Sequence, residues 1–409
     1  NFGQKPFKFP PPDGFQPLNT ANTRPETVIS RPDHYVGVTT YVGNGDPNSN
    51  TQTVRGLNFG DKPDFVWIKQ RSSTAQNHAL FDSIRGPGHN LSSSTTHAER
   101  SDHSGSTGDL MSFDVNGFTV GSSAASGARP VNLNGQDIVA WCWKAGGNSN
   151  TFNIDDVGYA SAAAAGLTAG DTTIAGASVG TKQGFSIIKY TGPNDTSAHE
   201  VAHGLSQAPD FIITKNLDNT YNWDIYHSAL GDNEYLIFTT AAKSSGRFSG
   251  RPTSTVFKTA HDYSTNENED YIAYCWHDVP GLQKFGTFSA NNSTSGPYVE
   301  LGFRPAIVWV KAASSAGDMT YASWLIADGE RSPTNPVSKA VFANKNVVEG
   351  KRGNGSDNYT GAWLDILSNG FKIRYNGTEV NGVSGQTYIY CAWAASPFSN
   401  LYGAQSNAR

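Results

Sequence analysis

The chain has 409 residues, of which 16% are charged, and its formal net charge is -5. No basic run or stripe marks a nucleic-acid-binding surface, so nucleic acid is not an expected partner. No apolar stretch approaches the roughly 18 residues that a membrane-spanning helix needs, so membrane insertion is not expected either. The 43 glycines and the 11% of aromatic residues favour short strands joined by turns over helices.

The first segment, residues 1–33, contains three consecutive prolines from Pro10 to Pro12 and shows no regular hydrophobic period. Such a segment is typical of an extended linker. The chain also begins with Asn1 and not with Met, as if a preceding domain had been left out. We therefore expect residues 1–33 to be the end of a preceding domain followed by a linker.

A strand-like phrase then occurs three times. Lys-Pro-Asp-Phe-Val-Trp-Ile-Lys ends at Lys69, Ala-Pro-Asp-Phe-Ile-Ile-Thr-Lys ends at Lys215, and Arg-Pro-Ala-Ile-Val-Trp-Val-Lys ends at Lys311. Each run of branched and aromatic side chains predicts a buried strand. Because the material between the copies differs in length and content, the pattern indicates one scaffold with variable loops, where recognition usually resides.

A second phrase closes each copy: Ile-Val-Ala-Trp-Cys-Trp, Tyr-Ile-Ala-Tyr-Cys-Trp and Tyr-Ile-Tyr-Cys-Ala-Trp. The chain has three cysteines, one in each closing phrase, and this distribution indicates neither a disulfide framework nor a metal site. We expect the cysteines and the tryptophans at recurring positions to be buried core residues. These residues are Cys142, Cys275, Cys391, Trp67, Trp309, Trp143, Trp276 and Trp393.

Two local patterns lie between these phrases. Asn116-Gly117 and Asn369-Gly370 each stand between strand-like residues, and Asn-Gly predicts a tight hairpin with a type I′ turn. Between the first and second copies lies a segment rich in Ala, Gly and Ser. Its run from Ala160 to Leu167 is long enough for a turn or two of helix, which would be marginal alone. We expect this segment to be an insert with little core of its own.

The predicted fold is all-β with little helix: three tandem antiparallel β-sandwich repeats of the jelly-roll or lectin-like type. The expected boundaries are 1–33 for the end of a preceding domain and its linker, 34–147 for repeat 1, 148–183 for the insert, 184–281 for repeat 2, 282–400 for repeat 3 and 401–409 for a C-terminal tail.

Several of these phrases resemble repeats of tail-fibre-like virion proteins of marine phages of the cyanophage type. They include Gly184-Phe-Ser-Ile-Ile-Lys-Tyr-Thr-Gly192, Asp270-Tyr-Ile-Ala-Tyr-Cys-Trp-His-Asp-Val-Pro-Gly281 and Gly302-Phe-Arg-Pro-Ala-Ile-Val-Trp-Val-Lys311. The resemblance covers residues 34–400, and the opening of the chain is similar to the end of a SPRY-like sandwich. The resemblance implies a location in the phage particle, trimeric assembly in the manner of fibres and no catalytic residues.

Residues that could carry catalysis or bind a metal do not form a recognisable motif. His97, Asp102 and His103 lie close together, but their spacing matches no standard ligand pattern, so a polar loop is the favoured interpretation. No Gly-x-Ser-x-Gly elbow occurs. The carboxylate pairs are typical of solvated loops, although sequence cannot show whether two acids face each other across a cleft. We therefore expect no enzyme activity, no cofactor and no metal.

Aromatic residues in the variable middles of the repeats are the candidate binding residues. They are flanked by Asn, Asp, Ser and Gly, and a ring with polar neighbours is what a sugar requires, because sugars have apolar C–H faces and polar rims. The alternative is that they are core residues of repeat-specific strands. The candidate glycan contacts are Trp223, Trp324, Trp363, Tyr321 and Tyr359.

The resemblance implies a phage virion structural protein, and with the candidate aromatic residues it predicts a tail fibre that contributes to attachment to a host-surface glycan. The expected partners are two further copies in a homotrimer, other virion proteins and host-surface polysaccharide. The expected location is the phage particle, in its tail, after synthesis in the host cytoplasm. Two alternatives are a capsid-decorating or other virion protein without receptor binding, and a glycan depolymerase.

Overall fold

The computed structural model describes residues 29–45, 51–73, 75–100, 109–121, 131–193, 197–260 and 268–397. Within these ranges the chain forms strands, with two short 3-10 helices, η1 (Pro32–His34) and η2 (Met319–Tyr321), and no α-helix. The all-β prediction is confirmed. In the same ranges, no helix has the length and apolarity to cross a membrane. Of the expected preceding-domain end and linker at 1–33, residues 1–28 lie outside the described residues, as does the expected tail at 401–409.

Repeat 1 is a sandwich of two antiparallel sheets. Four strands form one sheet in the order β1-β7-β3-β4, and three form the other in the order β2-β6-β5. The strands are β1 (Val36–Val42), β2 (Gln52–Arg55), β3 (Phe65–Gln70), β4 (Ala79–Asp82), β5 (Leu110–Asp114), β6 (Gly117–Val120) and β7 (Asp137–Trp143).

Repeat 3 has the same plan, with sheets in the orders β19-β26-β21-β22-β23 and β20-β25-β24. Its strands are β19 (Gln283–Ser289), β20 (Tyr298–Glu300), β21 (Phe303–Ala312), β22 (Leu325–Asp328), β23 (Ala340–Phe342), β24 (Leu364–Leu367), β25 (Gly370–Ile373) and β26 (Thr387–Pro397).

Repeat 2 extends this plan on both edges. Its large sheet has the order β16-β15-β14-β13-β18-β11-β10-β8-β9, and its small sheet is β12-β17. The strands are β11 (Phe185–Thr191), β12 (His199–Ala202), β13 (Phe211–Asn216), β14 (Asp224–His227), β15 (Glu234–Ile237), β16 (Ser244–Ser245), β17 (Val256–Thr259) and β18 (Asp270–Trp276). The insert supplies β8 (Phe152–Ile154), β9 (Val157–Tyr159) and β10 (Thr173–Gly180).

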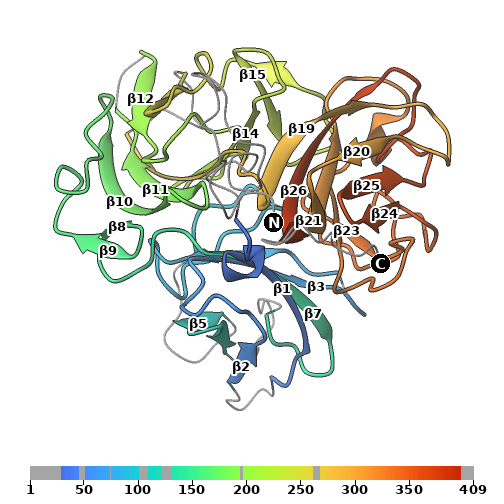
Figure 1. Cartoon of the computed structure of the whole chain (residues 1–409), viewed down its shortest axis with the longest axis horizontal. Coiled ribbons are helices and arrows are strands. Elements are labelled where there is room, and N and C mark those ends of the chain that lie inside the picture. The colour runs from blue at the N-terminus through green and yellow to red at the C-terminus, as the bar shows by residue number, and fades with distance from the viewer. Residues whose placement is uncertain are drawn as a thin grey trace, which may run out of the picture.

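The recurring phrases occupy the same place in each repeat. Each first phrase is paired with its closing phrase, with Phe65 opposite Trp143, Phe211 opposite Trp276 and Ile307 opposite Trp393. Figure 1 shows the three repeats as three lobes around a common centre. The prediction of one unit copied three times is thus confirmed at the level of strand topology and register.

The strands of the recurring phrases are buried on both faces, because each large sheet packs against two cores. One face of β3 and β7 contributes Val66, Ile68 and Cys142 to the core of the repeat 1 sandwich. The other face contributes Trp67 and Trp143 to a central core that the three repeats share. Repeats 2 and 3 divide their strands in the same way. The molecule is therefore a closed arrangement of three sandwiches, not a row of independent domains.

The closing tryptophans meet at the centre of this shared core. The ring centroids of Trp143, Trp276 and Trp393 lie 5.4 to 6.3 Å apart, with interplanar angles of 67° to 71°. All three rings are buried, and their indole N–H groups have no hydrogen-bond acceptor among the described residues. In edge-to-face contact an N–H group can point at an aromatic face. Such contacts offset part of the free-energy cost of burying an N–H group without a hydrogen-bond acceptor. These residues are core residues, as predicted.

The predicted hairpins form, but the glycines act differently from the prediction. Gly117 is paired with Asp114 and Gly370 with Leu367, so each glycine lies just after the turn, not within it. A Cβ on either glycine would lie 2.0 Å from the carbonyl oxygen of a residue in the adjacent strand. Close approach of the neighbouring strand therefore requires glycine here, and the predicted type I′ role for Asn-Gly is wrong.

The insert is a β-ribbon with a turn. β10 pairs antiparallel with β11, and β8 pairs parallel with β10, so the insert covers one edge of the repeat 2 sheet. The run from Ala160 to Leu167 forms consecutive turns and no helix. Leu167, Ile174 and Val179 enter the repeat 2 core. The insert therefore belongs to repeat 2. Its strand β10 pairs with the N–H and C=O groups on the edge of β11, which would otherwise be left without partners in the sheet.

Neighbouring repeats are joined by three equivalent lysines, which end the recurring first phrase. The Nζ of Lys69 in repeat 1 donates to Asn346 O of repeat 3, that of Lys215 in repeat 2 to Thr96 O of repeat 1, and that of Lys311 in repeat 3 to Thr240 O of repeat 2. These three distances are 3.2 to 3.3 Å. All three lysines are completely buried. Each repeat thus contacts the next in one cyclic order.

Candidate functional site

Three of the five predicted glycan contacts are core residues. Trp223 and Trp324 occupy equivalent positions, directly before β14 and β22, and lie between repeats. The indole N–H of Trp223 donates to Ser92 O of repeat 1 at 2.9 Å, and that of Trp324 to Ile237 O of repeat 2 at 2.8 Å. Trp363 lies in the core of repeat 3. Because their exposed fractions are at most 2%, the expectation that these rings stack on a glycan at the outer surface is wrong.

The other two candidates, Tyr321 and Tyr359, are partly exposed and belong to one group of side chains on repeat 3. Arg352 lies 3.9 Å from the ring centroid of Tyr321 and 5.5 Å from that of Tyr375. The rings of Tyr359 and Tyr375 lie 4.4 Å apart. We call Tyr321, Arg352, Tyr359 and Tyr375 the tyrosine–arginine cluster. The variable loops of repeat 3 therefore do bring aromatic rings and polar side chains together, but the rings are those of tyrosines and not of tryptophans.

The local backbone explains how these side chains come together. Asp318 caps η2, because its carboxylate accepts the N–H of Thr320, and this places Tyr321 at the end of the short helix. A Cβ on Gly353 would lie 1.9 Å from Tyr321 O, and one on Gly377 would lie 2.1 Å from the ring of Tyr375. Glycine is therefore required where the loops pass under the rings.

Hydrogen bonds fix the charged members of the cluster. The Nε and one terminal nitrogen of Arg352 donate to the two carboxylate oxygens of Glu379 at 2.9 and 3.1 Å, in a bidentate pair. The Tyr321 hydroxyl donates to Asp357 at 2.7 Å. This bond raises the pKa of Tyr321 and lowers the pKa of Asp357. At neutral pH, Asp357 is an ionised acceptor at the rim and Tyr321 is a neutral ring.

This arrangement is suited to binding. It offers tyrosine rings, a guanidinium near two of them, and a polar rim that includes Asp357 and Asn358, which are both exposed. Flat aromatic faces can contact the C–H faces of a sugar, while carboxylate and amide groups bind its hydroxyls. Arg352 and Tyr375 were not predicted from sequence. Tyr375 comes directly after the predicted hairpin, and this was the only available signal for it.

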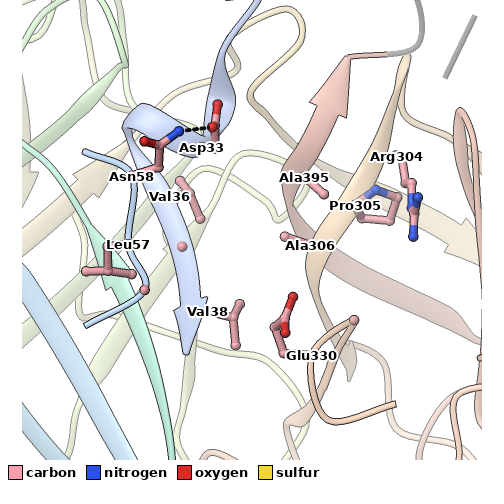
Figure 2. A pocket seen from close by; sticks show the side chains of 13 residues that line it. Asp33, Val36, Val38, Leu57, Asn58, Arg304, Pro305, Ala306, Glu330 and Ala395 are labelled. Carbon is pink, nitrogen blue, oxygen red and sulfur yellow. Dashed lines mark hydrogen bonds between the residues drawn. The ribbon is translucent and has the colours of Figure 1, made fainter. Parts of the chain in front are cut away.

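Apart from this cluster, a groove lies between repeats 1 and 3, with a volume of about 250 Å³ (Figure 2). Asp33 comes from one wall and Glu330 from the other, so the groove contains two carboxyl groups. Asp33 accepts hydrogen bonds from Arg31 and from Asn58, and the bond from Arg31 lowers its pKa. Asp33 is thus ionised at neutral pH, and a general acid for glycoside cleavage requires the opposite shift.

Two acids that do have a raised pKa hold the connections between repeats. Burial raises the pKa of Asp64 and that of Asp278 to about 6. Asp64 accepts the backbone N–H of Ala145 at 2.8 Å and that of Gly147 at 3.2 Å. Asp278 accepts the N–H of Phe285 at 2.7 Å. Their surroundings explain these shifts without a catalytic role.

The histidine-rich part of repeat 1 contains separate side chains. His78 is buried and contacts Phe342 O and Lys345 O, while His89 pairs with Glu99 at 3.0 Å. In the described part of the chain, no group of three His, Cys, Asp or Glu side chains could hold a metal ion. Asp102 and His103 lie outside the described residues. All three cysteines are free and buried, as predicted.

Comparison with protein-family models identifies the family of the chain. The family model described as a domain of unknown function, DUF7483, matches residues 31–397. No curated protein matches the chain. The matched region runs from before β1 to the end of β26, and so it includes all three repeats and the insert.

Proposed function

Because the chain belongs to the DUF7483 family, whose description assigns no activity, we propose a function from its own residues: it is a virion structural protein of a phage, a tail fibre that contributes to attachment to host-surface glycan. The observation that carries the binding part of this proposal is the tyrosine–arginine cluster. Its rings are partly exposed, ordered by glycines and hydrogen bonds, and bordered by polar side chains. The virion location rests on the resemblance of the repeat phrases to tail-fibre-like proteins.

Weak glycan contacts become effective when several copies act together. A single aromatic contact contributes about 0.5–1.5 kcal/mol beyond area burial. Linked or assembled copies raise the effective concentration of each further contact. We propose that the protein works as a homotrimer beside other virion proteins in the tail, so that several clusters face one host surface.

The proposal predicts that Tyr321→Ala weakens binding of the purified chain to bacterial surface polysaccharides by about 3–10-fold. Tyr321 lies outside the hydrophobic cores, so the loss of its ring should leave the melting temperature nearly unchanged. The measurement is binding to an array of lipopolysaccharide O-chains and capsular polymers, with the melting temperature determined in parallel. Tyr321→Phe should bind nearly as well as the unchanged chain, because it keeps the ring.

Tyr235→Ala is the matched control. Tyr235 is also partly exposed and also has an arginine over its ring, with Arg247 at 5.7 Å, but it lies on repeat 2. Its loss should not change glycan binding. Equal losses from Tyr235→Ala and Tyr321→Ala, or no binding of the unchanged chain to any polymer, would contradict the proposed site.

A further inference from the structure

The lysine-bearing ends of the three repeats meet around a pocket with a volume of about 260 Å³, which we call the axial pocket. Equivalent loops form its wall: Ser93 to Thr96 from repeat 1, Phe238 to Thr240 from repeat 2, and Asn344 with Lys345 from repeat 3. Asn222 and Trp223 complete the lining. The pocket shares no residue with the tyrosine–arginine cluster. Thr96 is exposed, so the rim is open to solvent.

The lining has the hydrogen-bonding groups of a polar ligand site. Hydroxyl groups predominate, two asparagine amides are added, and the aromatic members of the lining, Trp223 and Phe238, are at most 7% exposed. The hydroxyl oxygen of Thr95 is buried and has no hydrogen-bond partner among the described residues. A buried polar atom without a partner costs free energy unless a ligand or a water satisfies it.

One cation lines the pocket. Lys345 is the charged residue in the lining, and no carboxylate lines the pocket. Behind the wall, Lys215 donates to Thr96 O and Lys311 donates to Thr240 O, and both acceptor residues line the pocket. Lys69 binds Asn346 O, one residue beyond Lys345. Lysines of all three repeats therefore approach the pocket, and Lys345, the one in the lining, favours a negatively charged group there.

We propose that the axial pocket binds a small oxyanion, as carried by one acidic sugar unit such as a uronic acid. Lys345 selects the carboxylate, and the hydroxyl and amide groups of the lining bind the sugar hydroxyls. The volume is slightly below the usual range for ligand pockets, which begins near 300 Å³, and it suits a single sugar ring or a free oxyanion, not a longer chain.

The test is calorimetric titration of the full chain with D-glucuronate, D-glucose and inorganic sulfate, together with ligand-dependent melting temperatures. Glucuronate should bind at least 10-fold more tightly than glucose. Competition by sulfate would show that the oxyanion is the recognised group, free or sugar-borne, and failure of sulfate to compete would show that the sugar ring is also required. Equal binding of glucose and glucuronate, or binding of neither up to tens of millimolar, would overturn the proposal.

Variants separate this pocket from other anion-binding surfaces. Lys345→Gln and Thr95→Val should each weaken glucuronate binding at least 5-fold without lowering the melting temperature, because neither side chain belongs to a hydrophobic core. Lys243→Gln is the control, since Lys243 is a cation of repeat 2 that pairs with Glu234 and does not line the pocket. Glucuronate binding that is weakened equally by Lys243→Gln would place the site elsewhere and overturn the proposal.

Discussion

Each repeat buries one lysine at the end of its first recurring strand, and burial changes the protonation of all three. Desolvation lowers the pKa of Lys69 and that of Lys311 from 10.5 to about 7, and that of Lys215 to about 8. Glu349 near Lys69 and Asp224 near Lys215 oppose this shift, while Arg331 adds to it at Lys69. The backbone carbonyls that these lysines contact can accept a hydrogen bond from a neutral amine as well as from an ammonium group.

These shifts predict that the protein becomes more stable as pH rises from 7 to 8.5. Over this range the unfolded chain keeps three protonated lysines while the folded chain loses protons, so the unfolded state binds more protons and the free energy of unfolding increases. One proton of difference corresponds to about 1.4 kcal/mol per pH unit, so the total gain should be about 2–4 kcal/mol. Urea unfolding at several pH values measures it.

The variant Lys311→Met separates this effect from other titrations. It should remove about a third of the pH slope, since one of three buried amines is lost. The range ends at pH 8.5 because the buried cysteine thiols, whose pKa burial raises, begin to act in the opposite direction above it. A stability that is flat or falls between pH 7 and 8.5 would show that the lysines stay protonated in the fold.

Among the described residues, a buried ion pair occurs at two of the three interfaces between repeats and not at the third. Arg331 binds Asp328 at 2.5 Å, and Asp328 also accepts the indole N–H of Trp141 from repeat 1 at 2.9 Å. Repeat 1 has the equivalent ion pair between Arg85 and Asp82. Asp82 also accepts a hydrogen bond from the hydroxyl of Tyr274 of repeat 2. At the third interface the strand register places His227 and Leu230 of repeat 2 at the positions of Asp328 and Arg331. It places Cys391 of repeat 3 at the position of Trp141. The third interface therefore replaces charges and a large aromatic ring together.

Breaking the buried pair between Asp328 and Arg331 should lower the stability of the protein. Arg331→Leu should destabilise the protein by about 3–5 kcal/mol, because Asp328 keeps a buried charge without its cation. The double variant Asp328→Asn/Arg331→Leu removes both charges and should be less destabilised than the single one. Arg251→Leu breaks an exposed pair with Asp232 and should cost at most about 1 kcal/mol. A double variant no better than the single would rule out the unpaired charge as the cause.

The strands that hold these residues were well predicted, because buried strands leave a strong signal in sequence. Phe-Val-Trp-Ile-Lys and its copies are apolar at consecutive positions, and such a run indicates burial on both faces. The sequence does not say what covers each face. Cys391 shows why: it stands one position earlier than its counterparts, and a shift of one residue moves a strand side chain to the opposite face. Cys142 therefore lies in its sandwich core, whereas Cys391 lies in the central core.

The positions of the candidate glycan contacts were predicted less well, for a related reason. Trp223 and Trp324 lie in variable segments, which suggested exposure, but the central core needs large rings at the edge where repeats meet. No spacing in the sequence reports a contact between residues about 90 to 130 positions apart, such as Trp324 with Ile237 or Trp223 with Ser92. Tyr321 and Tyr359 were recognised because they combine rings with polar neighbours on long loops, and the loops of repeat 3 do bring them to one surface.

The three repeats also account for the groove in Figure 2. Asp64 binds the backbone of the connection from repeat 1 to repeat 2, and Asp210 binds that of the connection from repeat 2 to repeat 3. The equivalent residue of repeat 3 is Ala306, which lines the groove between repeats 3 and 1. Among the described residues no chain connection passes there, because repeat 3 is joined along the chain to repeat 2 and not to repeat 1. The lack of a chain connection at this interface thus explains both the open groove and the presence of Ala306 in place of an aspartate.

A shared central core predicts that the repeats unfold together. An isolated repeat would expose the apolar face that carries its closing tryptophan, such as Trp143, so each repeat should depend on the other two. The free cysteines report this directly, because each repeat buries one. Alkylation of Cys142, Cys275 and Cys391, followed by mass spectrometry across a urea series, should show all three becoming reactive at the same urea concentration.

The variant Trp143→Ala tests the coupling between repeats. It should lower the free energy of unfolding by about 3–5 kcal/mol, the range for a large buried aromatic ring. Because Trp143 contacts Trp276 and Trp393, the urea midpoints of Cys275 and Cys391 should fall together with that of Cys142. Phe118→Ala, which removes a ring from the separate sandwich core of repeat 1, is the matched variant, and it too should shift all three midpoints if unfolding is cooperative. A shift at Cys142 alone in either variant would show three independent sandwiches, and the central core would then contribute little to stability.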